Sequence, residues 1–334
     1  MLKGQVYIHS FMYSSLYKEV LSFFFTYALS YEPMEEKSCA VVTGGNKGIG
    51  LEICRQLALN NIQVILTARN ESRGIEATKK LNYSCLPNVV FHRLDVEDPA
   101  STTQLVEFIG THFKKLDILV NNAGITGFRF VADKIVYNAK GEGRLDLLFD
   151  ENKEPLPGVI EETYEMAEKC LKTNYYGTKG VTEALVPLLQ RSKSPRIVNI
   201  TSVNGLLSLI PNDKLKEELD DIDNLTEERI DEIIQCFLQD FKADKLRENG
   251  WPLEPSAYKL SKSAINAYTR LMAKKFQNRT LVNCVHPGVV KTDMTLNWGI
   301  DVEEGAKGPV MAALLPDDGP SGVYFNQTEI APFK

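Results

Sequence analysis

The sequence predicts an α/β protein with a single doubly wound parallel sheet of about seven strands and helices on both faces. The first observation is a repeated alternation of short apolar, β-branched runs with segments of helical periodicity, which predicts right-handed βαβ units. The second is a glycine-rich turn between the first strand and the helix that follows it. Strands are expected over residues 39–42, 62–67, 89–94, 116–120, 196–200 and 281–285, and helices over 103–113, 164–189 and 257–276.

The glycine-rich turn follows the buried strand CAVV and has the spacing GxxxGxG, with glycines at 44, 48 and 50 after Thr43. From Leu51 apolar residues recur at helical spacing, so the turn leads into a helix. Free backbone N–H groups and the positive end of the helix dipole then meet at one point, which suits a pyrophosphate and indicates a Rossmann-type fold. The alternative is a turn that needs glycine only for positive φ.

Composition places the chain among ordinary globular proteins and excludes some functions. It has 334 residues, 43% hydrophobic and 25% charged, with a formal net charge of −6, which argues against a nucleic-acid surface. Six scattered cysteines indicate small buried hydrophobic side chains in a reducing compartment, and we expect a cytoplasmic protein. The four histidines do not cluster with acids or cysteines, so no metal site is expected.

Residues 1–33 do not share the strand–helix alternation that begins at Ser38. Their apolar run, 20–31, is short for a bilayer span and lacks a signal-peptide pattern, so no stable membrane span is expected. We expect an extension outside the fold, followed by one Rossmann-type domain over residues 34–334.

Two long segments interrupt the alternation. Residues 125–163 show no clear periodicity, whereas residues 211–250 carry 13 acidic and 6 basic residues. In the second segment apolar residues recur at helical spacing, so an insertion of acidic amphipathic helices packed on the domain is expected.

The end of the second strand bears on the choice of dinucleotide. An acid there would bind the ribose 2′-OH of NAD, whereas a cation accommodates the 2′-phosphate of NADP. The strand ends in Arg69, and Lys47 lies in the glycine-rich turn, although Glu71 is a counter-signal. The two cations favour NADP(H).

Tyr258 and Lys262 are four residues apart and therefore share one helix face. A phenol is a poor proton donor and acceptor at neutral pH, and an adjacent ammonium lowers its pKa. Ser202, just beyond the fifth strand, can hydrogen-bond a substrate carbonyl. A surface Tyr–Lys pair is the plain alternative.

Together these residues resemble the short-chain dehydrogenase/reductase superfamily from Ser38 to the C-terminus. The supporting motifs, in the family's order, are Thr43-Gly44-x-x-x-Gly48-x-Gly50, Asp95 in LDV, NNAG at 121–124, Asn174 in NYYG, Ser202, Tyr258 with Lys262, and Pro287-Gly288. The resemblance implies that Tyr258 is the general acid, Ser202 polarises the carbonyl, Lys262 binds the nicotinamide ribose and lowers the Tyr258 pKa, and Asn174 holds a relay water. The cofactor contacts that it implies are Thr43, Gly44, Asn46, Lys47, Gly48, Ile49, Gly50, Arg69, Asp95, Val96, Asn122, Ala123, Gly124, Tyr258, Lys262, Pro287, Gly288, Val290 and Thr292.

The insertion before Tyr258 is similar to that of the carbonyl-reductase-like branch, which includes plant neomenthol dehydrogenases and salutaridine reductases. This resemblance implies a monomer that reduces a small hydrophobic cyclic ketone, of monoterpenoid or alkaloid type, with NADPH. A broad-specificity carbonyl reductase for reactive aldehydes and ketones, and an NADP-binding protein without catalysis, are the alternatives.

Overall fold

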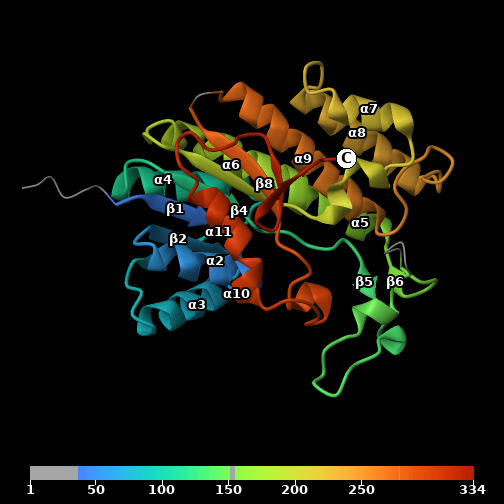
Figure 1. Cartoon of the computed structure of the whole chain (residues 1–334), viewed down its shortest axis with the longest axis horizontal. Coiled ribbons are helices and arrows are strands. Elements are labelled where there is room, and N and C mark those ends of the chain that lie inside the picture. The colour runs from blue at the N-terminus through green and yellow to red at the C-terminus, as the bar shows by residue number, and fades with distance from the viewer. Residues whose placement is uncertain (1–36, 151–154, 278) are drawn as a thin grey trace, which may run out of the picture. The chain divides into compact units, whose positions relative to one another are not determined.

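The core of the protein is an eight-stranded sheet with the strand order β10-β9-β8-β7-β4-β1-β2-β3 (Figure 1). The structure is a computed structural model that describes residues 37–150, 155–277 and 279–334; the expected extension, 1–33, lies outside them. The strands are β1 (Cys39–Val42), β2 (Gln63–Ala68), β3 (Val89–Arg93), β4 (Ile118–Asn121), β7 (Arg196–Ile200), β8 (Leu281–His286), β9 (Tyr324–Asn326) and β10 (Glu329–Ala331).

The six strands expected from the sequence are all present and pair in parallel. β9 adds a seventh parallel strand, and β10 returns antiparallel to it. The parallel sheet of about seven strands is therefore confirmed, and the short antiparallel edge strand is an addition. Because β2 and β4 lie on opposite sides of β1, the strand order reverses there, which is where such sheets bind ligands.

Helices cover both faces of the sheet, as expected. One face is covered by α2 (Gly48–Leu59), α3 (Glu71–Tyr83) and, near the C-terminus, α10 (Val302–Gly305) and α11 (Lys307–Ala313). The other is covered by α4 (Pro99–His112), α5 (Tyr164–Leu171), α6 (Gly177–Leu189) and α9 (Ser256–Lys275). Since both faces are packed, strand β1 is buried along its whole length.

The helix expected over 164–189 is interrupted. A π-helical turn, Lys172–Tyr176, joins α5 to α6. It places Asn174 at the widened turn, fully buried. Single π-helical turns inside α-helices are frequent at functional sites.

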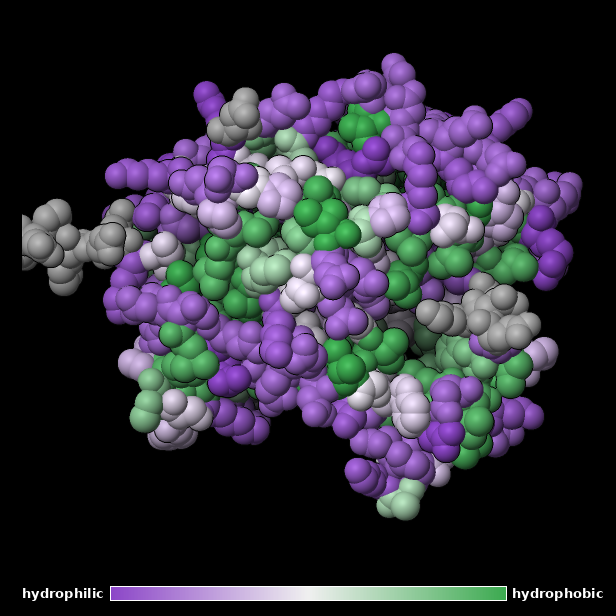
Figure 2. Space-filling view, in the orientation of Figure 1, coloured by the Kyte–Doolittle hydropathy of each residue, from purple (hydrophilic) through white to green (hydrophobic). Residues whose placement is uncertain are grey.

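The acidic insertion forms the two expected amphipathic helices, α7 (Asp213–Asp220) and α8 (Glu227–Lys242). The buried face of α8 carries Ile230, Ile234 and Phe237, which join the cluster beneath α6 and α9. Its polar face forms ion pairs with those helices, Asp231 with Lys179 and Glu227 with Lys275. Hydrophilic residues dominate the surface over α7 and α8 in Figure 2.

The segment after β4 forms a small lobe, residues 128–150 and 155–162, that stands off the sheet (Figure 1). It holds the paired strands β5 (Arg129–Phe130) and β6 (Ile160–Glu161) and a cluster of its own that includes Leu148 and Leu296. Leu296 belongs to the loop after β8, and its carbonyl accepts a hydrogen bond of 2.8 Å from the Gly143 backbone N–H. The lobe and this loop therefore form one unit.

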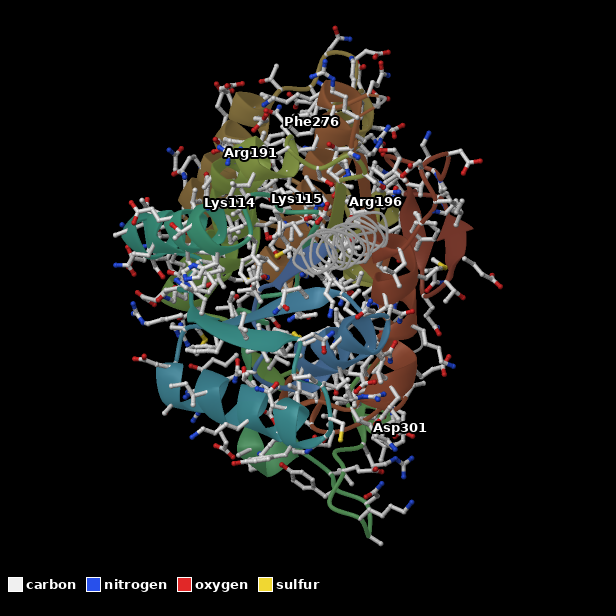
Figure 3. All side chains as sticks on the ribbon, turned by 90° about the vertical axis from the view of Figure 1, so that its left-hand side faces the viewer. Lys114, Lys115, Arg191, Arg196, Phe276 and Asp301 are labelled. Atoms are coloured by element: carbon white, nitrogen blue, oxygen red, sulfur yellow. The ribbon has the colours of Figure 1, made fainter. Side chains whose placement is uncertain are left out.

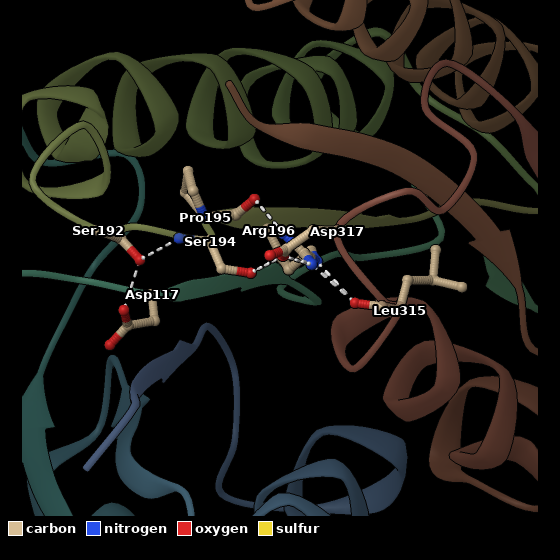
Figure 4. A network of polar contacts seen from close by, with 7 residues as sticks. All are labelled: Asp117, Ser192, Ser194, Pro195, Arg196, Leu315 and Asp317. Atoms are coloured by element: carbon tan, nitrogen blue, oxygen red, sulfur yellow. Dashed lines mark hydrogen bonds and ion pairs between the residues drawn. The ribbon is translucent and has the colours of Figure 1, made fainter. Parts of the chain in front are cut away.

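The amino ends of β4 and β7 are closed by a polar network (Figure 4). Asp117 accepts hydrogen bonds from Ser192 Oγ, at 2.5 Å, and from the backbone N–H of Cys39, at 2.8 Å. The Arg196 guanidinium donates to the Leu315 carbonyl and to Asp317. Figure 3 shows Arg196 on this end with Lys114, Lys115 and Arg191. These polar groups at the amino ends of the strands bond to one another and to the protein backbone. A ligand is therefore expected at the opposite end, where the strands have their carboxyl ends.

Candidate active site

The predicted site residues meet at the carboxyl ends of the central strands. Thr43 follows β1, Asn122 follows β4, Ser202 lies two residues beyond β7, and Pro287 follows β8. Because neighbouring parallel strands end at the same edge, four segments that are distant in sequence converge there.

The glycine-rich turn is locked onto the NNAG segment. The Thr43 hydroxyl oxygen accepts hydrogen bonds of 2.9 Å from the backbone N–H groups of Asn122 and Ala123. In return, the Asn122 amide donates to the carbonyls of Thr43 and Gly44, at 2.9 and 3.2 Å. A Cβ at Gly50 would lie 2.4 Å from the Asn122 amide nitrogen, so only glycine allows this approach.

This turn fits a dinucleotide pyrophosphate. Gly44 and Gly48 have φ values of +65° and +55°, which residues with a side chain rarely adopt. α2 begins at Gly48, and the preceding Lys47 makes no side-chain cap, so the first N–H groups of the helix have no side-chain acceptor at the N-cap. Asn46 and Ile49 complete the turn and are both partly buried.

The two cations proposed for the 2′-phosphate are both exposed at this end of the sheet. Arg69 directly follows β2 and forms no ion pair within the residues that the structure describes. The Lys47 ammonium lies 2.5 Å from the Asp293 carboxylate, with both side chains more than half exposed. Asp293 belongs to the loop after β8, so this ion pair links that loop to the glycine-rich turn.

The loop after β8 lies over the glycine-rich turn. A Cβ at Gly48 would lie 3.2 Å from the Thr292 side chain. Thr292 is held in place by hydrogen bonds with Thr295, and Val290 is 2% exposed and bridged to Ile300. Gly288, at φ +89°, makes the turn that follows Pro287.

Asp95 and Val96 follow β3, on the far side of β2. The Asp95 carboxylate accepts a hydrogen bond of 3.2 Å from the Glu97 N–H, and its own N–H donates to Ser101 Oγ. A Cβ at Gly177 would lie 2.8 Å from the Val96 side chain, so Val96 packs against the start of α6.

The Ser202 hydroxyl lies near enough to the Tyr258 phenol to influence its pKa. Burial raises the pKa of Tyr258 to about 12, and the Ser202 hydroxyl opposes that rise. The sequence argument expected the Lys262 ammonium to lower this pKa; in the structure, burial has the largest effect. The phenol is therefore protonated at neutral pH.

Lys262 lies one turn beyond Tyr258 on α9. Its Nζ is 5.6 Å from the centre of the Tyr258 ring and donates a hydrogen bond of 2.9 Å to the Ile200 carbonyl at the end of β7. Lys262 is 5% exposed, and burial lowers its pKa to about 8. The ammonium can therefore lose its proton within a physiological pH range.

The Asn174 side chain is held by hydrogen bonds to Ile125 and to Ser261. Its Oδ1 accepts from the Ile125 N–H at 2.8 Å, and its Nδ2 donates to the Ile125 carbonyl at 2.9 Å and to Ser261 Oγ at 3.0 Å. A Cβ at Gly124 would lie 3.2 Å from Asn174 Oδ1 and 3.8 Å from Lys262 Nζ, so Gly124 lies between these two side chains.

Sequence reasoning missed three residues at the site. Ser261 lies inside the Tyr–Lys helix motif, and its hydroxyl also donates to the Tyr258 carbonyl at 2.8 Å. Asp293 follows Thr292 and could have been found as the acid next to a predicted contact. Glu162 binds the start of α9 from 94 residues away, and no local pattern marks it.

Among the described residues, no group of three or more histidine, cysteine, aspartate or glutamate side chains is arranged to hold a metal ion. Within the same residues, no helix is both long enough and apolar enough to cross a membrane.

Comparison with known proteins defines the class. The family model for short chain dehydrogenase matches residues 38–212. Salutaridine reductase of Papaver somniferum is 51% identical over 89% of this chain and 97% of its own length. (+)-Neomenthol dehydrogenase of Arabidopsis thaliana is 49% identical over 88% of this chain and 97% of its own length.

The solved structure of the Papaver somniferum salutaridine reductase aligns with a TM-score of 0.80, covering 87% of this chain and 99% of that one, at 50% identity. The chain therefore belongs to the short-chain dehydrogenase family. It is an oxidoreductase of the kind that acts on carbonyl and alcohol groups.

Proposed function

We propose that this protein is an NADPH-dependent reductase that converts a hydrophobic cyclic ketone, of monoterpenoid or alkaloid type, to the secondary alcohol. The observation that carries the proposal is the neighbouring pair Ser202 and Tyr258, with Lys262 one helical turn away. These three groups are a carbonyl polariser, a proton donor and a cation at the carboxyl end of a dinucleotide-binding sheet.

The proposed cofactor is NADP(H), bound by the residues of the glycine-rich turn, the ends of β2, β3 and β4, and the loop after β8. When bound, it supplies the hydride. The exposed guanidinium of Arg69 and the ammonium of Lys47 would bind the 2′-phosphate, since charged groups form the stronger hydrogen bonds to phosphate. Lys262, which lies beside Gly124, would bind the nicotinamide ribose.

The state of Tyr258 suits reduction. A phenol that holds its proton at neutral pH can donate it to a developing alkoxide. Ser202 would hydrogen-bond the carbonyl oxygen and increase its polarisation.

Asn174 would hold a water that links Lys262 to solvent. Its partner Ile125 lines a hollow of about 370 Å³ together with Phe128 and Met166, which supports a route outward.

Exposed apolar side chains on the loop after β8 and on the attached lobe support a hydrophobic substrate. Val289 and Met294, in the loop after β8, are exposed, as are Tyr137 and Leu147 of the attached lobe. Hydrophobic residues are visible over this lobe in Figure 2. The plant relatives reported above, named for salutaridine and neomenthol, agree with this substrate class.

A panel assay tests the proposal. NADPH consumption is followed with cyclic terpenoid ketones, alkaloid ketones and small reactive aldehydes at equal concentrations. We expect kcat/KM to be highest for a cyclic ketone. Equal rates across the panel would favour a broad carbonyl reductase instead, and NADPH binding without turnover would favour a non-catalytic protein.

We also propose that the protein is a cytoplasmic monomer whose domain spans residues 34–334. The packing of α8 on α6 and α9 supports the monomer, because it covers a helical face that could otherwise bind a second copy. Light scattering at micromolar concentration tests the monomer. A chain that starts at Met34 tests the domain boundary and should keep its melting temperature and activity.

A further inference from the structure

The helix that carries Tyr258 and Lys262 has no cap of its own. The N-cap of α9 is Pro255, which has no side-chain acceptor, and no local side chain caps the first turn. The first N–H groups of a helix have no intrahelical partner, and leaving them unpaired in a buried position is costly. Ser256 and Ala257 are 1% and 0% exposed. Another part of the chain must therefore supply the acceptor.

Glu162, which lies 94 residues before Ser256, supplies the acceptor for the first N–H groups of α9. Its Oε2 accepts hydrogen bonds of 2.9 Å from both the backbone N–H and the hydroxyl of Ser256. Its Oε1 accepts one of 2.8 Å from the Ala257 N–H. A carboxylate at a helix N-terminus also interacts favourably with the helix dipole. One side chain thus holds the two residues that directly precede Tyr258.

Glu162 links α9, which carries Tyr258, to α5, which leads to Asn174. The next residue, Thr163, is the N-cap of α5 and accepts a hydrogen bond from the Met166 N–H at 3.3 Å. α5 leads into the π-helical turn that holds Asn174. Neighbouring residues therefore fix the start of the Asn174 helix and the start of the Tyr258 helix. Further along, the 3.0 Å bond from Asn174 to Ser261 ties the same two helices together.

We propose that Glu162 is a positioning residue for ketone reduction. By capping α9 it holds Tyr258 in register with Asn174 and Ser202. This inference rests on the proposed function for its kinetic part, but the cap itself does not depend on the substrate. A small displacement of a proton donor costs rate and need not affect cofactor binding.

The test uses Glu162→Gln and Glu162→Ala in the full chain, with Glu161→Gln as the matched control. Glu161 is the preceding residue and has the same charge, but its carboxylate pairs with the exposed Arg129, at 2.6 Å. Three quantities are measured: kcat with the best ketone of the panel, Kd for NADPH by fluorescence, and hydrogen exchange of the peptide that contains residues 256–258.

We expect Glu162→Ala to lower kcat by about 10- to 100-fold. Exchange of the first-turn amides should accelerate, and Kd for NADPH should stay within about twofold of the parent. Glu162→Gln keeps one acceptor oxygen and the side-chain length, so its kcat should lie between those of the parent and the alanine variant. Glu161→Gln should match the parent in all three quantities.

A parental kcat in Glu162→Ala, despite faster exchange, would overturn the positioning role. Unchanged exchange would overturn the cap itself. If the parent reduces no ketone, the proposed function fails while the exchange measurement still decides whether Glu162 caps the helix.

Discussion

The cofactor side and the catalytic side of this protein are built in different ways. The cofactor side, residues 39–124, is held by side chains that bond to the backbone of another recognisable motif, such as the reciprocal bonds of Thr43 with the NNAG segment. The catalytic side depends on a side chain that comes from a segment with no recognisable motif, Glu162 at the start of α9. A side-chain change on the catalytic side should therefore alter chemistry while leaving the dinucleotide site intact.

The largest expected effect comes from Tyr258→Phe. The change keeps the ring but removes the hydroxyl, which we propose as the proton donor. General acid catalysis contributes about 10²- to 10⁴-fold, so kcat should fall by that order while Kd for NADPH changes little. Steady-state kinetics and fluorescence titration measure the two quantities.

The control for this variant is Tyr164→Phe. Among the described residues, the Tyr164 hydroxyl bonds only to Glu168, at 3.2 Å, so its loss should leave kcat unchanged. If Tyr258→Phe keeps the parental kcat, the proposed mechanism is wrong. The expected difference between the catalytic side and the cofactor side would then also be contradicted.

The second prediction concerns the cofactor side, where both cations proposed for the 2′-phosphate are removed. Lys47→Ala combined with Arg69→Ala should raise the KM for NADPH by up to about 30-fold, because each exposed charge pair contributes at most about 1 kcal/mol. The KM for NADH should change little, since NADH lacks the 2′-phosphate. Lys80→Ala, which removes an exposed cation paired with Glu76, is the control. Equal losses for both cofactors would contradict the assignment.

The third prediction concerns pH. Burial lowers the pKa of Lys262 to about 8, so its ammonium is present below that pH and lost above it. Tyr258, at about 12, keeps its proton throughout. kcat/KM for ketone reduction should therefore fall above about pH 8, by up to about tenfold per pH unit, as the charged form disappears. The melting temperature at each pH serves as the control for unfolding, and a flat profile to pH 10 would contradict a catalytic need for the charge.

The difference between the two sides also explains how much the sequence could predict. The glycine-rich turn, the six central strands and the Tyr258–Lys262 helix follow from local periodicity and spacing, and the structure has them all. The π-helical turn at Asn174 has no such local signal, because apolar spacing continues through residues 164–189. The lobe between β4 and α5 is shaped by contacts such as Gly143 with Leu296, which are 153 residues apart and leave no periodic pattern.

Burial explains the remaining difference, at Tyr258. The sequence shows that an ammonium lies four residues away, which favours a lowered pKa. It does not show how far the phenol is removed from water, and in the structure this desolvation has the larger effect.

The smallest effect is expected at Asp293, where the two sides meet. Its carboxylate pairs with Lys47 and so competes with a cofactor phosphate for the same ammonium. Because both side chains are exposed, such a pair contributes at most about 1 kcal/mol, which corresponds to about fivefold in affinity. Asp293→Asn should therefore lower Kd for NADPH by up to about fivefold and leave Kd for NADH nearly unchanged. In the Lys47→Ala background the same substitution should have no such effect, because the ammonium for which they compete is gone. An equal gain in both backgrounds would show that Asp293 repels the cofactor directly rather than by holding Lys47.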